Sequence, residues 1–211
     1  MVATLADMVT RIARDTGLGT SFAQEIKDSI VAAIRLHETE PLWFLQDRTT
    51  LTLQDGDISV SLPDDFKAHI SLRVLVNGRW MGERHGFKSR TFNELLEENT
   101  DDTNTGYPET WALFGSRIYV NRTADDDYDL DLPYIKGDVA YPSADSDSSV
   151  WFDEGFEVIR LEATAIFLRD RVHATSEELI AAIKSAETGA AEHLETLQKR
   201  STTRLHTHRL S

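Results

Sequence analysis

The sequence predicts an α+β protein: a four-helix body, with two helices from each end of the chain, carries an inserted antiparallel β region. Near both ends, apolar residues recur at three- and four-residue steps, the period of a helix that buries one face. In the middle, apolar and polar residues alternate, which is typical of strands. The turn signals Asp55-Gly56 and Asn77-Gly78 separate these alternating stretches.

The same patterns divide the chain into four parts. The expected parts are N-terminal helices in 1–45, an inserted β region with acidic loops in 46–150, C-terminal helices of the same body in 151–198, and a basic C-terminal arm in 199–211.

Two helices are expected before residue 45. The first, over 2–15, has an apolar stripe and ends at Gly17. Ser21 and Gln24 have the spacing of a capping box, which predicts that the second helix begins there and runs to about residue 38. The stripe of the first helix consists of Val2, Leu5, Met8, Val9 and Ile12.

The middle is expected to consist of strands joined by tight turns. Stretches 49–53 and 58–62 alternate on either side of Asp55-Gly56, which predicts a hairpin, and a strand over 72–76 ends at a second turn. Thr91 and Glu94 form a capping box that opens a short helix around 92–98. Further strands are expected at 111–114, 117–120 and 128–132, followed by a loop over 137–149.

Two helices are expected after residue 150. The helix over 153–172 is apolar on two faces, which indicates that it packs on both sides. Thr175 and Glu178 form a third capping box, and the helix that follows has an apolar seam from Leu179 to Leu197. The residues expected in the hydrophobic centre of the body are Phe156, Ile159, Ala163, Ile166 and Phe167.

The net charge of −14 is concentrated in one segment. Residues 94–157 hold 17 acidic side chains and three basic ones, so the rest of the chain is neutral. A surface of this kind does not bind nucleic acid by neutralising phosphates. It is either a solvated loop face, a surface that repels a passing polyanion, or one that meets a basic partner.

The last residues have the opposite charge. No acid follows Glu195, and the tail is basic, so it is either a disordered end or an arm that docks on a partner. The residues of this candidate arm are Lys199, Arg200, Arg204, Leu205, His206, His208, Arg209 and Leu210.

No residues are assigned to catalysis, to a cofactor or to a metal, and the protein is not expected to be an enzyme. The chain has no cysteine, and no phosphate-binding, serine-hydrolase or zinc-protease motif occurs. Its carboxylates lie among Ser, Thr and Asn, whereas a catalytic acid needs an apolar pocket that raises its pKa. The N-terminus lacks the apolar core of a signal peptide and no apolar run spans a bilayer, so a cytosolic or particle-bound protein is expected.

The order of these elements resembles the head-to-tail adaptor (connector) proteins of tailed bacteriophages and related gene transfer agents. The resemblance covers roughly residues 1–200. It rests on Trp43-Phe44 after the second helix, the LPDDF segment 62–66, the TGYPETW segment 105–111, and paired strands at 118–120 and 128–134. One departure is Asn121-Arg122, where the family often has a proline.

The resemblance implies a ring of copies, usually twelve, beneath the portal of the virion head. Such a ring extends the DNA channel and offers a platform for the tail, and it is assembled in the host cytoplasm. The implied partners are further copies of the chain, the portal protein and a tail or stopper (nozzle) protein; DNA passes without specific binding, and no membrane is involved. In this setting the basic arm is expected to dock on the portal.

In the same setting, part of the acidic segment is expected to face the channel or its mouth. The candidate residues are Glu94, Glu97, Glu98, Asp101, Asp102, Asp125, Asp126, Asp127, Asp129 and Asp131.

The sequence is also compatible with three other functions. A tail-completion or stopper protein would share the class of assembly protein without the portal contact. A tail-associated cell-wall hydrolase would digest peptidoglycan in a zymogram, and an acidic DNA mimic would act as a free monomer or dimer that inhibits a DNA-binding enzyme.

Overall fold

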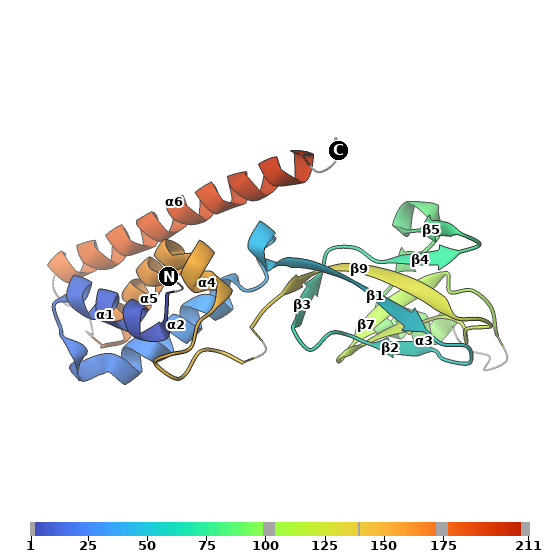
Figure 1. Ribbon diagram of the computed structural model, residues 1–211, viewed down its shortest axis with the longest axis horizontal. Coiled ribbons are helices and arrows are strands. Elements are labelled where there is room, and N and C mark those ends of the chain that lie inside the picture. Colours follow the sequence, from blue (N-terminus) through green and yellow to red (C-terminus); the bar gives the residue numbers. More distant parts are fainter. Residues whose placement is uncertain (1–2, 99–103, 139, 172–176, 208–211) are drawn as a thin grey trace. The chain divides into compact units, whose positions relative to one another are not determined.

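The computed structural model describes residues 3–98, 104–138, 140–171 and 177–207 (Figure 1). The chain forms two compact units, one from residues 1–45 with 137–211 and one from residues 46–136. The first unit is helical and the second is built mainly of strands, which confirms the predicted α+β class. The stretch after residue 136 belongs with the helices, because the backbone N–H groups of Leu5 and Ala6 donate to the carbonyls of Asp147 and Asp145.

The first helix, α1 (Leu5–Thr16), begins at a capping box that was not predicted from the sequence. The Thr4 hydroxyl accepts from the Asp7 N–H at 3.3 Å, and the Asp7 carboxylate accepts from the Thr4 N–H at 3.0 Å. The helix ends as predicted at Gly17, whose φ of 67° lies in the left-handed region that favours glycine. The predicted stripe is buried from Leu5 to Ile12, while Val2 lies outside the described residues.

The second helix, α2 (Ala23–His37), does not use the predicted cap. A short 3-10 turn, η1 (Thr20–Phe22), precedes it, and Gln24 donates to the Asp28 carboxylate at 3.0 Å. The helix instead begins where the chain leaves η1, and its buried face, from Ile26 to Ile34, holds it on the body. A second 3-10 turn, η2 (Trp43–Leu45), closes this part of the chain.

The helix expected over 153–172 is two helices, α4 (Val150–Glu154) and α5 (Phe156–Arg171), separated at Gly155. A Cβ at this position would lie 2.5 Å from Cε3 of Trp151, so glycine lets the chain pass close to the buried indole. The central position of α5 is confirmed, because it packs against α1, α2 and α6 (Figure 1).

Replacing Gly155 with alanine is expected to lower the free energy of unfolding by about 1–3 kcal/mol, because the Trp151 ring must move in a packed core. Gly189→Ala is the matched control. Its Cβ would meet only the flexible end of Leu161, at 3.0 Å, and alanine favours helix, so its stability should stay level or rise by about 1 kcal/mol. Urea melts of both variants measure the free energy of unfolding. Equal losses of stability in the two variants would contradict the close approach of Gly155 to the Trp151 ring.

The predicted centre of the body is confirmed at three of five positions. Ile159, Ala163 and Phe167 are buried, whereas Phe156 and Ile166 are half-buried and lie at the edge of the core. The Arg11 guanidinium lies over the Phe156 ring, with its Cζ 6.0 Å from the ring centroid.

The last helix, α6 (Glu177–Thr207), carries the predicted seam. Ile183, Ala186, Ala190 and Leu197 are buried along it, with Leu179 and Leu194 half-buried. The third capping box lies outside the described residues, because Thr175 does.

The second unit contains two sheets. The first has the order β1 (Gln46–Leu53), β9 (Tyr128–Lys136), β4 (Arg73–Val76), β5 (Arg79–Met81), with β3 (Phe66–His69) also paired to β9. The second has the order β2 (Ser59–Ser61), β8 (Arg117–Val120), β7 (Thr110–Phe114), β6 (Lys88–Ser89). The pairs are antiparallel except for the short parallel pair of β6 and β7.

Some strand pairings differ from those that the sequence predicts. The predicted hairpin around Asp55-Gly56 is wrong, because β1 pairs with β9 and β2 pairs with β8. Strands β8 and β9 are likewise not paired with each other. The turn at Asn77-Gly78 is confirmed: both residues have positive φ, 50° and 72°, and join β4 to β5.

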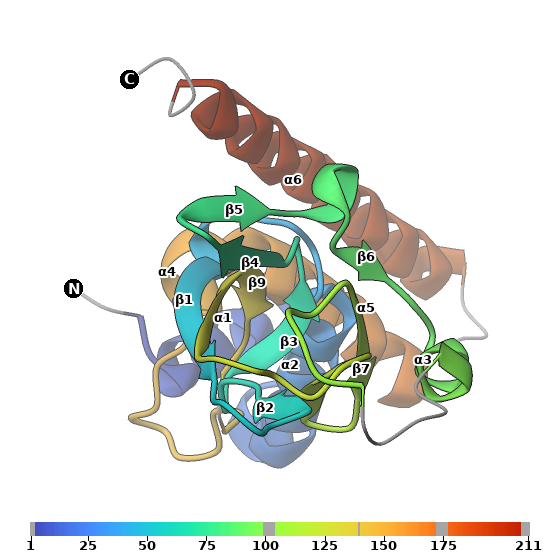
Figure 2. The ribbon, with the colours of Figure 1, turned by 90° about the vertical axis from the view of Figure 1, so that its right-hand side faces the viewer.

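The two sheets enclose one hydrophobic core. Figure 2 shows the strands arranged around this interior. Its buried members include Leu53, Val74, Phe87, Trp111 and Leu130. The short helix α3 (Phe92–Glu98) packs against β7 and begins at the predicted capping box of Thr91 and Glu94, with N···O distances of 2.8 and 3.3 Å to the side-chain oxygens.

Candidate functional site

Five of the unit's acidic side chains form an exposed acidic tip where β1 ends and β9 begins. Two loops are joined there: Gly56 N–H donates to Ala124 O at 2.9 Å, and Ala124 N–H donates to Asp57 O at 3.0 Å. The Asp127 carboxylate also accepts from the Asp55 N–H at 2.9 Å. The acidic tip consists of Asp55, Asp57, Asp125, Asp126 and Asp127.

No lysine or arginine forms an ion pair with the acidic tip within the described part of the chain. The sequence predicts three of its members, Asp125, Asp126 and Asp127, as candidate acids and Asp55 only as part of a turn, while Asp57 was not singled out. Asp129, another candidate, lies beside the tip and accepts from the Thr52 hydroxyl at 3.3 Å. The spacing of 70 residues between the two loops gives no local signal that they meet.

Asp131 does not belong with the exposed acids, because its side chain is buried, and it therefore does not fit the expectation of a channel-facing carboxylate. It is 1% exposed and lies on the central strand β9, where Arg48 of β1 and Arg73 of β4 both donate to its carboxylate. Burial raises the pKa of Asp131, but the hydrogen bonds and charges of the two guanidinium groups outweigh this and hold the pKa below its ordinary value. Asp131 therefore joins three strands of the sheet rather than facing solvent.

The candidates on α3 are mostly engaged in local structure. Glu94 caps the helix, and Glu98 accepts from Arg90 Nε at 3.0 Å and from the Thr110 hydroxyl at 2.6 Å. The bond from Thr110 is the main cause that lowers the pKa of Glu98. Glu97 is exposed and has no ion-pair partner among the described residues. Asp101 and Asp102 lie outside those residues.

The basic arm begins as a continuation of helix α6. Helix α6 continues past the expected end at residue 198 to Thr207, and Ser201 is buried, with its hydroxyl accepting from the Trp43 N–H at 3.0 Å. The physical reason is that Ser201 follows Leu197 at a four-residue step, so the seam extends by another turn. Cationic side chains such as Lys199, which pairs with Glu195 at 2.6 Å, are also favourable near a helix C-terminus.

The backbone of Arg204, Leu205 and His206 is helical, while His208, Arg209 and Leu210 lie outside the described residues.

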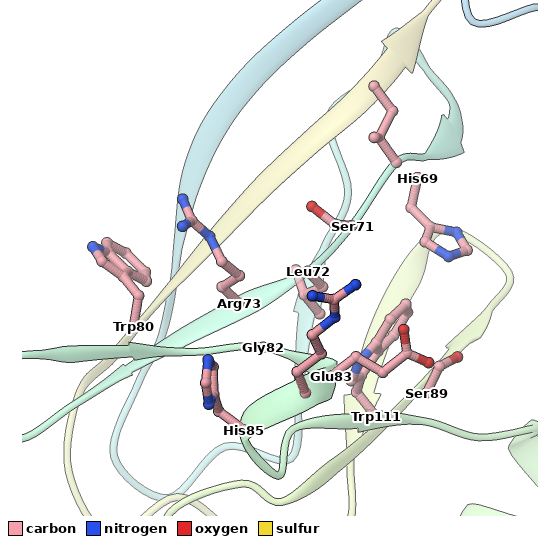
Figure 3. A pocket seen from close by; sticks show the side chains of 12 residues that line it. His69, Ser71, Leu72, Arg73, Trp80, Gly82, Glu83, His85, Ser89 and Trp111 are labelled. Carbon is pink, nitrogen blue, oxygen red and sulfur yellow. The ribbon is translucent and has the colours of Figure 1, made fainter. Parts of the chain in front are cut away.

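A hollow of about 450 Å³ in the second unit was not predicted. Figure 3 shows Arg73 and Trp80 from neighbouring strands on one side and His69 beside Trp111 on the other. The Arg73 guanidinium lies over the Trp80 ring at 5.5 Å, and the His69 ring meets Trp111 edge-on at 5.1 Å. We call this the basic hollow; its lining includes His69, Ile70, Arg73, Trp80, Glu83, Arg84, His85 and Trp111.

A local excess of basic residues is the sequence signal that could have indicated the basic hollow. Residues 66–90 contain six lysines and arginines against one acid, Glu83, inside a strongly acidic chain. A second, adjoining hollow shares Trp80 and His85 and adds Arg79. Neither Arg79 nor Arg84 has an ion-pair partner within the described ranges.

Within the ranges that the structure describes, no three His, Asp or Glu side chains gather as metal ligands would. Among the same residues, no helix has both the length and the apolar character that crossing a bilayer requires.

Comparison with known proteins gives one clear finding. A family model described as SU10 adaptor protein matches residues 3–207, which spans both units. A search of curated proteins gives no match.

Proposed function

Because the chain belongs to the SU10 adaptor protein family, a family of phage head-tail adaptors, we propose that its copies form a ring beneath the portal of a phage head. The family supports a structural role at the head-tail junction and a place in the virion. The observation that carries the finer proposal is the match over residues 3–207, because it includes both the helical unit and the β unit. The ring, of about twelve copies, extends the DNA channel and receives the tail or stopper protein.

The experiment mixes the purified chain with portal-bearing heads and examines the particles by electron microscopy. A ring of added density below the portal is the expected result. Density that appears only after a separate adaptor has bound would favour the second candidate, a tail-completion or stopper protein. Clearing of peptidoglycan in a zymogram would favour a tail-associated hydrolase instead.

The acidic tip is the part of the proposed ring that faces the DNA path. Its carboxylates are exposed and no basic side chain of the described residues offsets them, so they repel phosphates and let the duplex slide. Asp129 belongs to this surface, while Asp131 does not, because it is buried between Arg48 and Arg73.

Reversing two charges of the tip, Asp125→Lys with Asp126→Lys, is expected to create DNA binding that weakens steeply with salt, since lysines on the channel wall release counterions from phosphate. Glu177→Lys with Glu178→Lys is the matched control, because it changes the charge equally at the exposed start of α6. Filter binding of ring preparations at two salt concentrations measures the effect. Equal DNA binding by both variants would place the tip away from the DNA path.

The C-terminal end of α6 is the proposed portal contact. Because α6 reaches Thr207, this contact is made by a helix. The basic side chains from Lys199 to Arg209 would meet acidic groups of the portal through charge-assisted hydrogen bonds.

Charge reversal tests this contact better than truncation, because removal of residues after 198 would also remove the buried Ser201. Arg200→Glu with Arg204→Glu should weaken attachment to portal-bearing heads by about tenfold or more, with only a small fall in the thermal midpoint from the loss of cations near the end of α6. Lys184→Glu, on an exposed part of the same helix, is the control. Cosedimentation with heads measures attachment, and undiminished attachment of the double variant would assign docking elsewhere.

A further inference from the structure

An exposed aromatic ridge lies where α3 packs against β7. The Phe92 and Phe114 rings are stacked with centroids 4.2 Å apart, and Tyr119 meets Phe92 at 5.1 Å. Phe114 nevertheless remains 56% exposed, and Leu96, one helical turn after Phe92, remains 53% exposed. Contiguous apolar surface of this kind commonly marks a protein interaction site. The aromatic ridge consists of Phe92, Leu96, Phe114 and Tyr119.

The charged side chains beside the aromatic ridge are acidic, whereas those of the basic hollow are mostly basic. Glu94 and Glu97 lie on α3 next to the ridge residues, and Glu97 has no ion-pair partner among described residues. The hollow carries Arg84, with Arg79 in the adjoining hollow, and one acid, Glu83. The same hollow also exposes apolar surface, because Ile70 is 47% and Trp80 38% exposed.

These charges decide which surfaces of two copies can meet. A contact of ridge with ridge would bring the α3 carboxylates of both copies together, and a contact of hollow with hollow would bring the guanidinium groups together. Like charges in a desolvated contact are unfavourable. A contact of ridge with hollow instead places aromatic on aromatic surface and carboxylate beside guanidinium, which is the composition of well-packed interface centres.

We propose that the aromatic ridge of one copy docks in the basic hollow of a second copy. The two patches differ, so each copy offers one of each and the contact repeats head to tail, which closes a ring when the rotation between copies permits. This inference rests on the proposed ring and names the surfaces that would form it. Both patches belong to the β unit, so the β unit supplies lateral contacts in this arrangement.

Two variants of the full chain each remove one half of the contact. Phe114→Ser alters the ridge and Arg84→Glu alters the hollow. Both side chains are exposed, so both variants should fold, with a small fall in the thermal midpoint for Phe114→Ser because its ring stacks on Phe92. Each variant alone is expected to associate about tenfold or more weakly than the natural chain in sedimentation velocity. Leu36→Ser and Lys184→Glu, exposed positions of the helical unit, are the matched controls and should assemble normally.

Mixing the two variants is the decisive step. A head-to-tail contact leaves one intact junction, between the ridge of the Arg84→Glu chain and the hollow of the Phe114→Ser chain, so the mixture should form dimers but no rings. A further chain that combines Arg84→Glu with Glu97→Lys should regain association, because the pair of charges is exchanged at every junction.

The remaining outcomes overturn the inference in distinguishable ways. If the natural chain forms rings and both variants do so equally well, the ridge and the hollow are not the lateral contact, and the proposed function stands. If the variants form rings but fail to attach to heads, these surfaces bind another virion protein, not a second copy. If the natural chain stays monomeric both alone and with portal-bearing heads, the ring and this contact fail together.

Discussion

Replacing Phe167 with alanine should lower the free energy of unfolding by about 3–5 kcal/mol, the cost of removing a large ring from a packed core. Phe167 is 1% exposed on the central helix α5, and its ring lies 6.1 Å from that of Phe22. The surrounding helices are held on several sides, so the cavity cannot close by a small shift. Urea melts followed by circular dichroism measure the loss.

Phe156→Ala is the matched control for this prediction. Phe156 lies on the same helix but is half-buried, so the loss on removal of its ring should be clearly smaller. A loss below about 1 kcal/mol for Phe167→Ala would mean that α5 does not hold the central position that the structure gives it.

The double replacement Arg48→Ala with Arg73→Ala should destabilise the protein by about 3–5 kcal/mol at neutral pH, because it leaves the Asp131 carboxylate buried without a cation. In the natural chain, Arg73 Nε donates to Asp131 at 2.9 Å and Arg48 donates from the opposite strand. The triple variant that also carries Asp131→Leu should recover much of the loss, since no buried charge remains. A double variant as stable as the natural chain would contradict the role of this ion pair.

The pH dependence of the same site has a definite sign. Because the folded-state pKa of Asp131 lies below its ordinary value, its ionisation stabilises the fold above the pKa of an unfolded aspartate, about 4. This contribution is lost as the pH falls through the folded-state pKa. The difference in stability between the natural chain and the double variant should therefore be largest near neutral pH and should narrow as the pH falls, because the buried carboxylate of the variant becomes protonated.

What the sequence could predict was local. The seam of α6 recurs at fixed steps from Leu179 to Leu197, the Asn77-Gly78 turn needs two residues of positive φ, and the cap of α3 needs only Thr91 and Glu94. Each signal is contained in a few neighbouring residues. The structure confirms all three for that reason.

What the sequence could not predict depends on partners far along the chain. The alternation around Asp55-Gly56 suits a hairpin, but it suits equally two strands that leave the turn for different sheets. Asp131 alternates with Asp129 as an exposed acid would, and its burial follows only from arginines on two other strands. The basic hollow likewise brings together residues as distant as His69 and Trp111.

The first residue pair between β1 and β9 has a consequence for how genes of this family can recombine. Gln46, where the chain enters the β unit, pairs with Ile135, one residue before the strand ends at Lys136. Paired residues of an antiparallel ladder have Cα atoms about 4.5–5.5 Å apart, so the entry and the exit of the β unit are neighbours. A segment with adjacent ends can be transplanted as a cassette, or replaced by a short turn, without stretching the polypeptide that remains. Gene fusion between chains with different inserts would then need only two closely spaced crossover points in space, although they lie 90 residues apart in the gene product.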